Sequence, residues 1–208
     1  MFAVSRITVR KALQDLVTEG WLVRRQGRGT FVDLSRARRP ASIDIREAMQ
    51  QVADLGAATQ VRDGKVAETI ADDETLAALD LAPGERVQQA RHVRVLAGVP
   101  LGLITTYVPM RIASKVAGQR GTTRQPMFQL IARSGIKVTE AEQWIGATLA
   151  DVETARALDV DVGAPLLKIT RIVCGARRIP VERVVALYRA DAYHYRMHLK
   201  PMKKQRGA

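Results

Sequence analysis

Apolar and polar residues alternate with a helical period at the start of the chain. Apolar side chains recur every three or four residues, at Val9, Ala12, Leu13 and Leu16. This spacing predicts an amphipathic helix over about residues 5–19, with Ser5 as its N-cap and Gly20 as its end. A different face carries long hydrogen-bond donors, at Arg6, Arg10 and Gln14. The helix therefore has one side for a core and another for a polar partner.

A strand pattern follows this helix. The segments "WLVRR" and "GTFVD" have the composition of short strands, and "QGRG" between them predicts a tight hairpin turn. A helix followed by a basic hairpin is the layout of a winged helix-turn-helix, whose helix enters the major groove of DNA while the hairpin contacts the adjacent minor groove or its backbone. The pattern also leaves open a solvated amphipathic helix followed by an ordinary hairpin.

The longer part of the chain contains an internal repeat. A helix is predicted near Glu47 to Leu55, followed by extended segments around an Asp63-Gly64 turn. A short helix and two strands come next, and after the helical segment "PMFQLIARSG" the same order of strand, helix and two strands returns. At an offset of 79 residues, "ADDETLAALDLAPG" aligns with "ADVETARALDVDVG". We therefore expect an α+β fold in which two related halves share one antiparallel sheet.

Each copy of this repeat has the same predicted helix. An Asp caps its start, and a Gly-containing turn releases the chain into the next strand. Leu79 in one copy and Leu158 in the other are predicted to face the core. These shared positions are structural and indicate no chemistry.

Composition narrows the class of protein. The chain has 208 residues and a formal net charge of +12, which favours a polyanionic partner such as nucleic acid. The single cysteine, Cys174, excludes an intramolecular disulfide and a zinc site made of several cysteines. No apolar stretch approaches the ~20 residues of a membrane span. We expect a soluble cytoplasmic protein with no membrane partner.

The first part of the chain resembles a known family. "SRITVRKALQDLVTEGWLVRRQGRGTFV" is similar to the recognition helix and wing of GntR-family bacterial transcription regulators. The resemblance implies contacts to double-stranded operator DNA from helix residues Ser5, Arg6, Thr8 and Arg10 and from wing residues Gln26, Gly27 and Arg28. In the family two further helices precede this one, whereas only Met1 to Val4 precede it here. We therefore expect a truncated DNA-binding domain, through a mis-assigned start codon or a real loss.

The rest of the chain resembles the UTRA effector-binding domain of the HutC branch of that family. The resemblance spans about Glu47 to Leu199 and is carried by the two repeated helices, "RHVRVLAGVP", "PVERVVALYRAD" and "YHYRMHL". It implies a chorismate-lyase-like fold, an antiparallel sheet with flanking helices. The expected domains are a partial winged helix-turn-helix, a linker, the UTRA domain and a basic tail, at residues 1–34 (helix about 5–19, wing about 21–33), 35–46, 47–200 and 201–208.

The resemblance also implies an effector site. Arg94, Glu182 and Tyr188 match ligand-binding positions of sugar-phosphate-binding members, and His92 stands where many members have arginine. Other positions depart from the family, at Ile104, Pro126 and Phe128. We therefore predict a small anionic or zwitterionic metabolite as effector. An Arg94–Glu182 salt bridge and a core role for Tyr188 remain alternatives.

Few residues point to catalysis. The only histidines are His92, His194 and His198, and the helical spacing of the last two provides too few ligands for zinc. No nucleophile elbow, phosphate loop or dinucleotide fingerprint occurs. We predict a homodimeric, ligand-responsive repressor with no catalytic residue, metal or cofactor. The alternatives are a small-molecule-binding module that cannot bind DNA and, because of the fold, a lyase-like enzyme.

Overall fold

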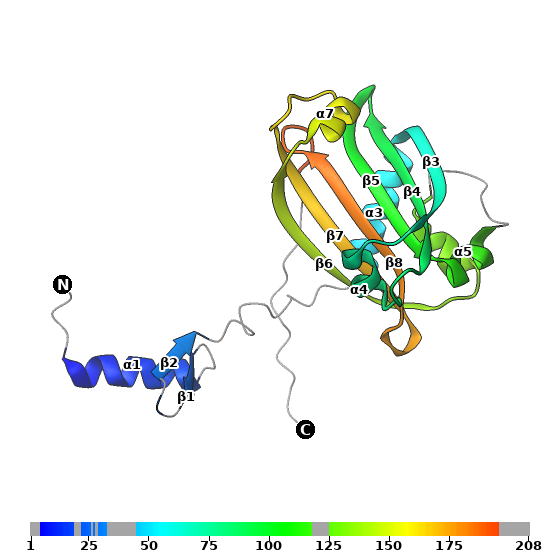
Figure 1. The fold of residues 1–208 in the computed structure, drawn as a ribbon. Helices are drawn as coiled ribbons and strands as arrows, with labels where there is room; N and C mark the ends of the chain where they lie inside the picture. The colour runs from blue at the N-terminus through cyan, green and yellow to red at the C-terminus, as the bar shows by residue number, and fades with distance from the viewer. Residues whose placement is uncertain are drawn as a thin grey trace. The chain divides into compact units, whose positions relative to one another are not determined.

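The computed structural model describes residues 5–18, 22–25, 27, 29–32, 45–117 and 125–195. The chain divides into two compact units, Met1–Ile43 and Asp44–Ala208. Figure 1 shows a helix and hairpin in the first unit and a large twisted sheet in the second. Among the described residues, no helix is long and apolar enough to cross a membrane.

The first unit contains one helix and one hairpin, as the sequence predicts. Helix α1 covers Arg6–Thr18, and strands β1 and β2 cover Leu22–Arg25 and Gly29–Val32 and pair antiparallel. Ser5 caps α1, because its Oγ accepts a hydrogen bond from the backbone N–H of Thr8 at 3.1 Å. Gly27 lies in the hairpin turn with φ +71°. The predicted helix end at Gly20 lies outside the described residues.

The apolar side of α1 is not buried. No residue of the helix is buried, and Val9, Leu13 and Leu16 are all exposed. The predicted core-facing role of this stripe is therefore not fulfilled within the described residues. The reason is geometric, since one helix beside a two-stranded hairpin provides too few surfaces to enclose a core.

The second unit is built on one antiparallel sheet in the order β3-β4-β5-β8-β7-β6. Its strands are β3 Gln60–Ile70, β4 Arg86–Leu96, β5 Val99–Pro109, β6 Val138–Leu149, β7 Pro165–Gly175 and β8 Pro180–Arg189. Its helices are α3 Ile45–Ala58, α4 Asp73–Leu79, α5 Met110–Val116, α6 Met127–Arg133 and α7 Val152–Leu158, with a short 3-10 turn η2 at Ala176–Arg178. The mixed fold predicted from the sequence is confirmed.

The internal repeat is visible in the topology. The elements β3-α4-β4-β5 form one half and β6-α7-β7-β8 the other, and the halves meet where β5 pairs with β8. Asp72 and Asp151 each accept a hydrogen bond of 2.7 Å from the backbone N–H three residues later. Leu79 and Leu158 are both 0% exposed. Both predictions made from the repeat, the caps and the buried leucines, are confirmed.

One local prediction is wrong. The sequence indicates a turn at Asp63-Gly64, but β3 continues through these residues as one strand. The pairing of β3 with β4 shifts register between Arg62 and Lys65, and Asp63 has φ 54°. A bulge accommodates the extra residues, and β4 keeps its pairing on both sides of it.

The two faces of the sheet carry different contents. On the face covered by α7, Val93, Leu103 and Leu166 pack with Leu158 in an apolar cluster. Because side chains alternate along a strand, the neighbours of Val93 in β4, His92 and Arg94, point to the opposite face. That face is covered by α3 and α6, and the candidate site lies there.

Candidate functional site

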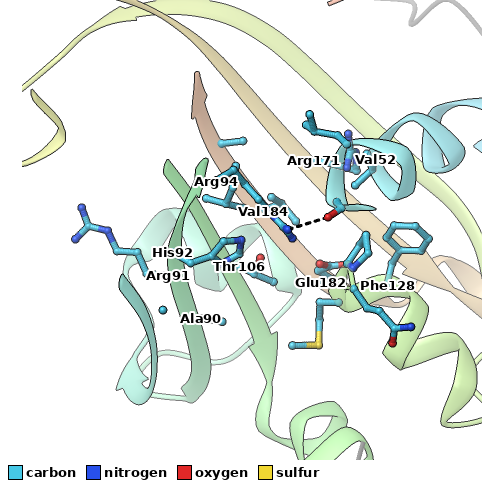
Figure 2. Close-up of a pocket in the computed structure, with 18 of the residues that line it drawn as sticks. Val52, Ala90, Arg91, His92, Arg94, Thr106, Phe128, Arg171, Glu182 and Val184 are labelled. Carbon is cyan, nitrogen blue, oxygen red and sulfur yellow. Dashed lines mark hydrogen bonds between the residues drawn. The ribbon is translucent and has the colours of Figure 1, made fainter. Parts of the chain in front are cut away.

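A cavity of about 230 Å³ lies between the sheet and helices α3 and α6. It is smaller than the ~300–1,000 Å³ typical of ligand pockets, which favours a compact occupant. All four predicted effector residues line it, His92 and Arg94 from β4 and Glu182 and Tyr188 from β8. Figure 2 shows His92, Arg94 and Glu182 around the same space.

Two buried polar atoms in this cavity lack a hydrogen-bond partner among the described residues, His92 Nε2 and Glu182 Oε2. Glu182 is only 2% exposed, and burial raises its pKa to about 7 although the charge of Arg171 opposes this. Burial and the charge of Arg94 lower the pKa of His92 to about 4. Unsatisfied buried polar groups are costly, so both atoms are prepared to accept a partner from a ligand.

Arg94 attaches the sheet to helix α3. Its Nη1 donates to the backbone carbonyl of Gly56 at 3.4 Å and to Thr59 Oγ1 at 3.5 Å, and Figure 2 shows a dashed bond from Arg94 to the helix. A cation at the C-terminal end of a helix is favourable because the last carbonyls carry partial negative charge. Arg94 therefore holds the helix that contributes Val52 and Leu55 to the cavity wall.

Arg171 is a cavity residue that sequence analysis missed. Its Nε donates to Gln143 Oε1 at 2.8 Å, and Nη2 donates to the same oxygen. The repeat contained the signal, because the 79-residue offset places Arg171 on His92. Applying the offset to the strands as well as to the helices would have identified this residue.

Tyr188 depends on a glycine beside it. Arg94, Gly102 and Tyr188 are paired in register across β4, β5 and β8. A Cβ on Gly102 would overlap the Tyr188 ring. That ring also stacks on Tyr193, with centroids 4.0 Å apart and an interplanar angle of 14°. Tyr188 is thus both buried and part of the cavity wall, so the two predicted roles coincide.

Apolar side chains complete the cavity. Ile104, Phe128 and Val184 line it beside the polar groups. A ligand therefore meets charged and hydrogen-bonding groups on the sheet and an apolar wall around them. No group of three or more His, Cys, Asp or Glu side chains in the described part of the chain is arranged to hold a metal. His198, one of the two histidines considered as ligands, lies outside that part.

The predicted DNA-contacting residues of α1 lie on its surface. Ser5, Arg6, Thr8 and Arg10 are all exposed. The hydroxyls of Ser5 and Thr8 are 2.9 Å apart, which fixes the first turn of the helix. Gln26 and Arg28 of the wing lie outside the described residues. In the hairpin, the Arg25 guanidinium lies 5.8 Å from the centre of the Phe31 ring, a contact that the sequence did not indicate.

Comparison with protein families is decisive at this point. Residues 54–194 match the UTRA domain, and residues 1–32 match the bacterial regulatory proteins of the gntR family. The chain belongs to the GntR family of regulators that carry a UTRA domain. The resemblance inferred from the sequence is confirmed.

Individual relatives agree with this family. The histidine utilization repressor of Pseudomonas putida is 32% identical over 84% of this chain and 69% of its own length. The repressor NagR of Bacillus subtilis is 26% identical over 93% of this chain and 79% of its own length. The crystal structure of PhnF from Mycobacterium smegmatis matches with a TM-score of 0.59 at 28% identity, covering 95% of this chain and 87% of that one. These relatives are named as regulators, and those given as repressors differ in what their names say they control.

Proposed function

We propose that this GntR-family regulator is a homodimeric transcriptional repressor that binds operator DNA and is released from it by a small effector. The observation that carries the proposal is that one chain joins a GntR-family segment to a UTRA domain with a polar, incompletely satisfied cavity. A dimer suits this role because two copies match the two half-sites of a palindromic operator. The proposed location is the cytoplasm, where the DNA is.

The effector we propose is a compact anionic or zwitterionic metabolite. Arg94 and Arg171 provide positive charge for its acidic group, and Glu182 Oε2 can accept a hydrogen bond from a donor on the same molecule. The apolar wall contains Ile104 and Phe128, which leaves fewer polar partners than a sugar phosphate requires. The pocket binds this ligand without transforming it.

Arg94 gives the effector a way to act on the rest of the chain. An acidic ligand group competes with Gly56 and Thr59 for the Arg94 guanidinium, and this competition weakens the attachment of α3. Helix α3 is the first helix after residues 33–44, which connect it to the DNA-binding segment. A ligand that prefers one position of α3 shifts the population of regulator states in proportion to that preference.

The proposed test measures DNA binding with protein expressed from its gene with the native upstream region. The operator is selected from a random DNA library, and affinities for operator and random DNA are compared. Arg6→Ala is expected to cost about 1–3 kcal/mol on the operator and much less on random DNA, because a base contact is specific.

Lys11→Ala is the matched control, since Lys11 is another exposed cation of α1 and is expected to lose affinity equally on both DNAs. Failure to select any operator would contradict the repressor function. Equal losses for Arg6→Ala on both DNAs would remove its base-reading role. For the cavity, the selected complex is challenged with a panel of small acids, which are recovered and checked for chemical change.

A further inference from the structure

The six-stranded sheet has two edges, β3 and β6, and they differ in how they are protected. The β3 edge carries charges at Arg62, Asp63, Lys65 and Glu68 and a bulge between Arg62 and Lys65. Arg62 is also occupied, because its guanidinium donates to the carbonyl of Ala157 at 2.8 Å. Charges and bulges are the features by which edge strands avoid pairing with other chains. The β3 edge is therefore closed to a further strand.

The β6 edge lacks this protection over its second half. From Gln143 to Leu149 the strand contains no charged residue and no proline. Trp144 is 50% exposed, Ile145 43% and Leu149 67%. The irregularity in the β6–β7 register lies at the start of the strand, between Val138 and Glu140. A long, regular and apolar edge of this kind is open to pairing with another strand.

We propose that β6 pairs antiparallel with β6 of a second copy of this chain, about a twofold axis at Ile145, so that two sheets become continuous. This inference rests on the proposed homodimer and identifies its interface. Antiparallel pairing about a twofold axis is isologous, because each residue of one copy meets the symmetric residue of the other.

The distribution of charge on β6 is compatible with this pairing. Its charged residues, Glu140 and Glu142, lie in the first half and are bound by Arg178 at 2.9 and 3.0 Å. Antiparallel pairing centred on Ile145 places this half beside the uncharged half of the partner. A centre shifted toward Glu142 would instead bring like charges opposite each other, which is destabilising.

Gly146 supports the same register. A Cβ on Gly146 would meet nothing within 4 Å, so the strand has an open space there. On β7 the residue paired with Gly146 is Lys168, which does not fill this space. A twofold axis at Ile145 sets Trp144 of one copy opposite Gly146 of the other, on the same face. An aromatic side chain over an edge glycine is a stabilising cross-strand pair, and Lys168 beside it adds a cation–π contact.

The inner side of β6 is anchored at the same place. Gln143 accepts hydrogen bonds from Arg171 of β7, one of the cavity residues. The strand is thus held in position immediately before its uncharged half, and pairing costs little ordering of the edge.

Cysteine cross-linking in the full 208-residue chain tests the register directly. Residues opposite each other across an antiparallel pair have Cα atoms about 4.5–5.5 Å apart, within the range of a disulfide. Ile145→Cys is expected to form a covalent dimer under mild oxidation. Ile70→Cys is the matched control, since Ile70 is an exposed isoleucine on the β3 edge and Cys174 is present in both variants.

A second measurement gives the strength of the interface. Ile145→Lys sets two like charges together and is expected to raise the dimer dissociation constant about tenfold or more by analytical ultracentrifugation. Ile70→Lys is expected to leave it unchanged. Circular dichroism verifies folding, and if Ile145→Lys unfolds, the Ile145→Cys cross-link decides. A dimer that cross-links no better at residue 145 than at residue 70 overturns the β6 interface alone. A chain that is monomeric at all concentrations overturns the proposed homodimer as well.

Discussion

The two halves of the UTRA domain have the same frame but different chemistry. Both have an aspartate cap, a buried leucine and a pair of strands. Yet the first half brings His92 to the cavity at the position where the second half brings Arg171. One of these groups is a histidine whose pKa burial lowers to about 4, and the other is an arginine bound to Gln143.

This difference shows which positions the repeat leaves free to vary. Residues that form the frame point to the helix-covered core or cap a helix, and they are the same in both halves. Residues that point to the cavity differ, because their role is to meet different parts of one ligand. A pocket between two similar halves can thus be chemically asymmetric without any asymmetry in the fold.

The largest expected effect concerns the buried leucines. Leu79→Ala and Leu158→Ala are each expected to cost about 2–5 kcal/mol in the free energy of unfolding, because each removes a fully buried side chain and leaves a cavity. Urea denaturation measures both. Val152→Ala, at an exposed position of α7, is the control. If one leucine variant lost less than about 1 kcal/mol, the two halves would not share an equivalent core.

A smaller effect concerns the pH dependence that belongs to one half only. Glu182 binds its proton more tightly in the folded state, with a pKa of about 7. The wild-type protein therefore loses stability from this group as the pH rises from about 4.5 to about 7. Glu182→Gln lacks this loss, so its free energy of unfolding relative to wild type is expected to rise by roughly 3 kcal/mol at most over that window.

His92 has the opposite pH dependence, because its lowered pKa makes stability rise between about pH 4 and 6.5. It is present in both proteins and cancels in the comparison. Denaturation at several pH values gives the difference curve, and Glu85→Gln in an exposed turn serves as reference. A flat difference curve would mean that Glu182 is not held in a desolvated site.

The smallest expected effect tests the helix caps. Asp72→Ala is expected to cost about 1 kcal/mol, because the N–H of Thr75 loses its partner. Asp151→Ala should change stability in the same direction and by no more, since its carboxylate is more exposed. Both aspartates have a lowered pKa, caused by hydrogen bonds from Thr75 and Thr154 respectively, so the cap contribution is lost in acid. Thermal unfolding measures both, and a stabilised variant would contradict the cap assignment.

Much of the fold follows from sequence patterns. The repeat predicted both caps, both buried leucines and the single sheet, because these depend on local spacing and on hydrophobic periodicity. The strand "VTEAEQWIGATL" corresponds to β6 as observed. The bulge in β3 was not predicted, because it depends on pairing with β4, and a sequence pattern does not contain the partner strand.

The candidate site was predicted in part. His92, Arg94, Glu182 and Tyr188 do line one cavity. The contact of Arg94 with α3 was not predicted, because it joins residues 38 positions apart through a side chain and a carbonyl. Arg171 was missed for a different reason, since it lies among apolar residues of β7 and only the repeat reveals its equivalence to His92.

The close approach of Gly102 and Tyr188 has a consequence for changing the ligand. The ring occupies the volume that a methyl group on β5 would need. Enlarging residue 102 alone pushes the ring away from Tyr193, and shrinking residue 188 alone leaves a void beside Arg94. The two positions therefore behave as one variable, and a regulator engineered for a bulkier or flatter effector must exchange both in a single step.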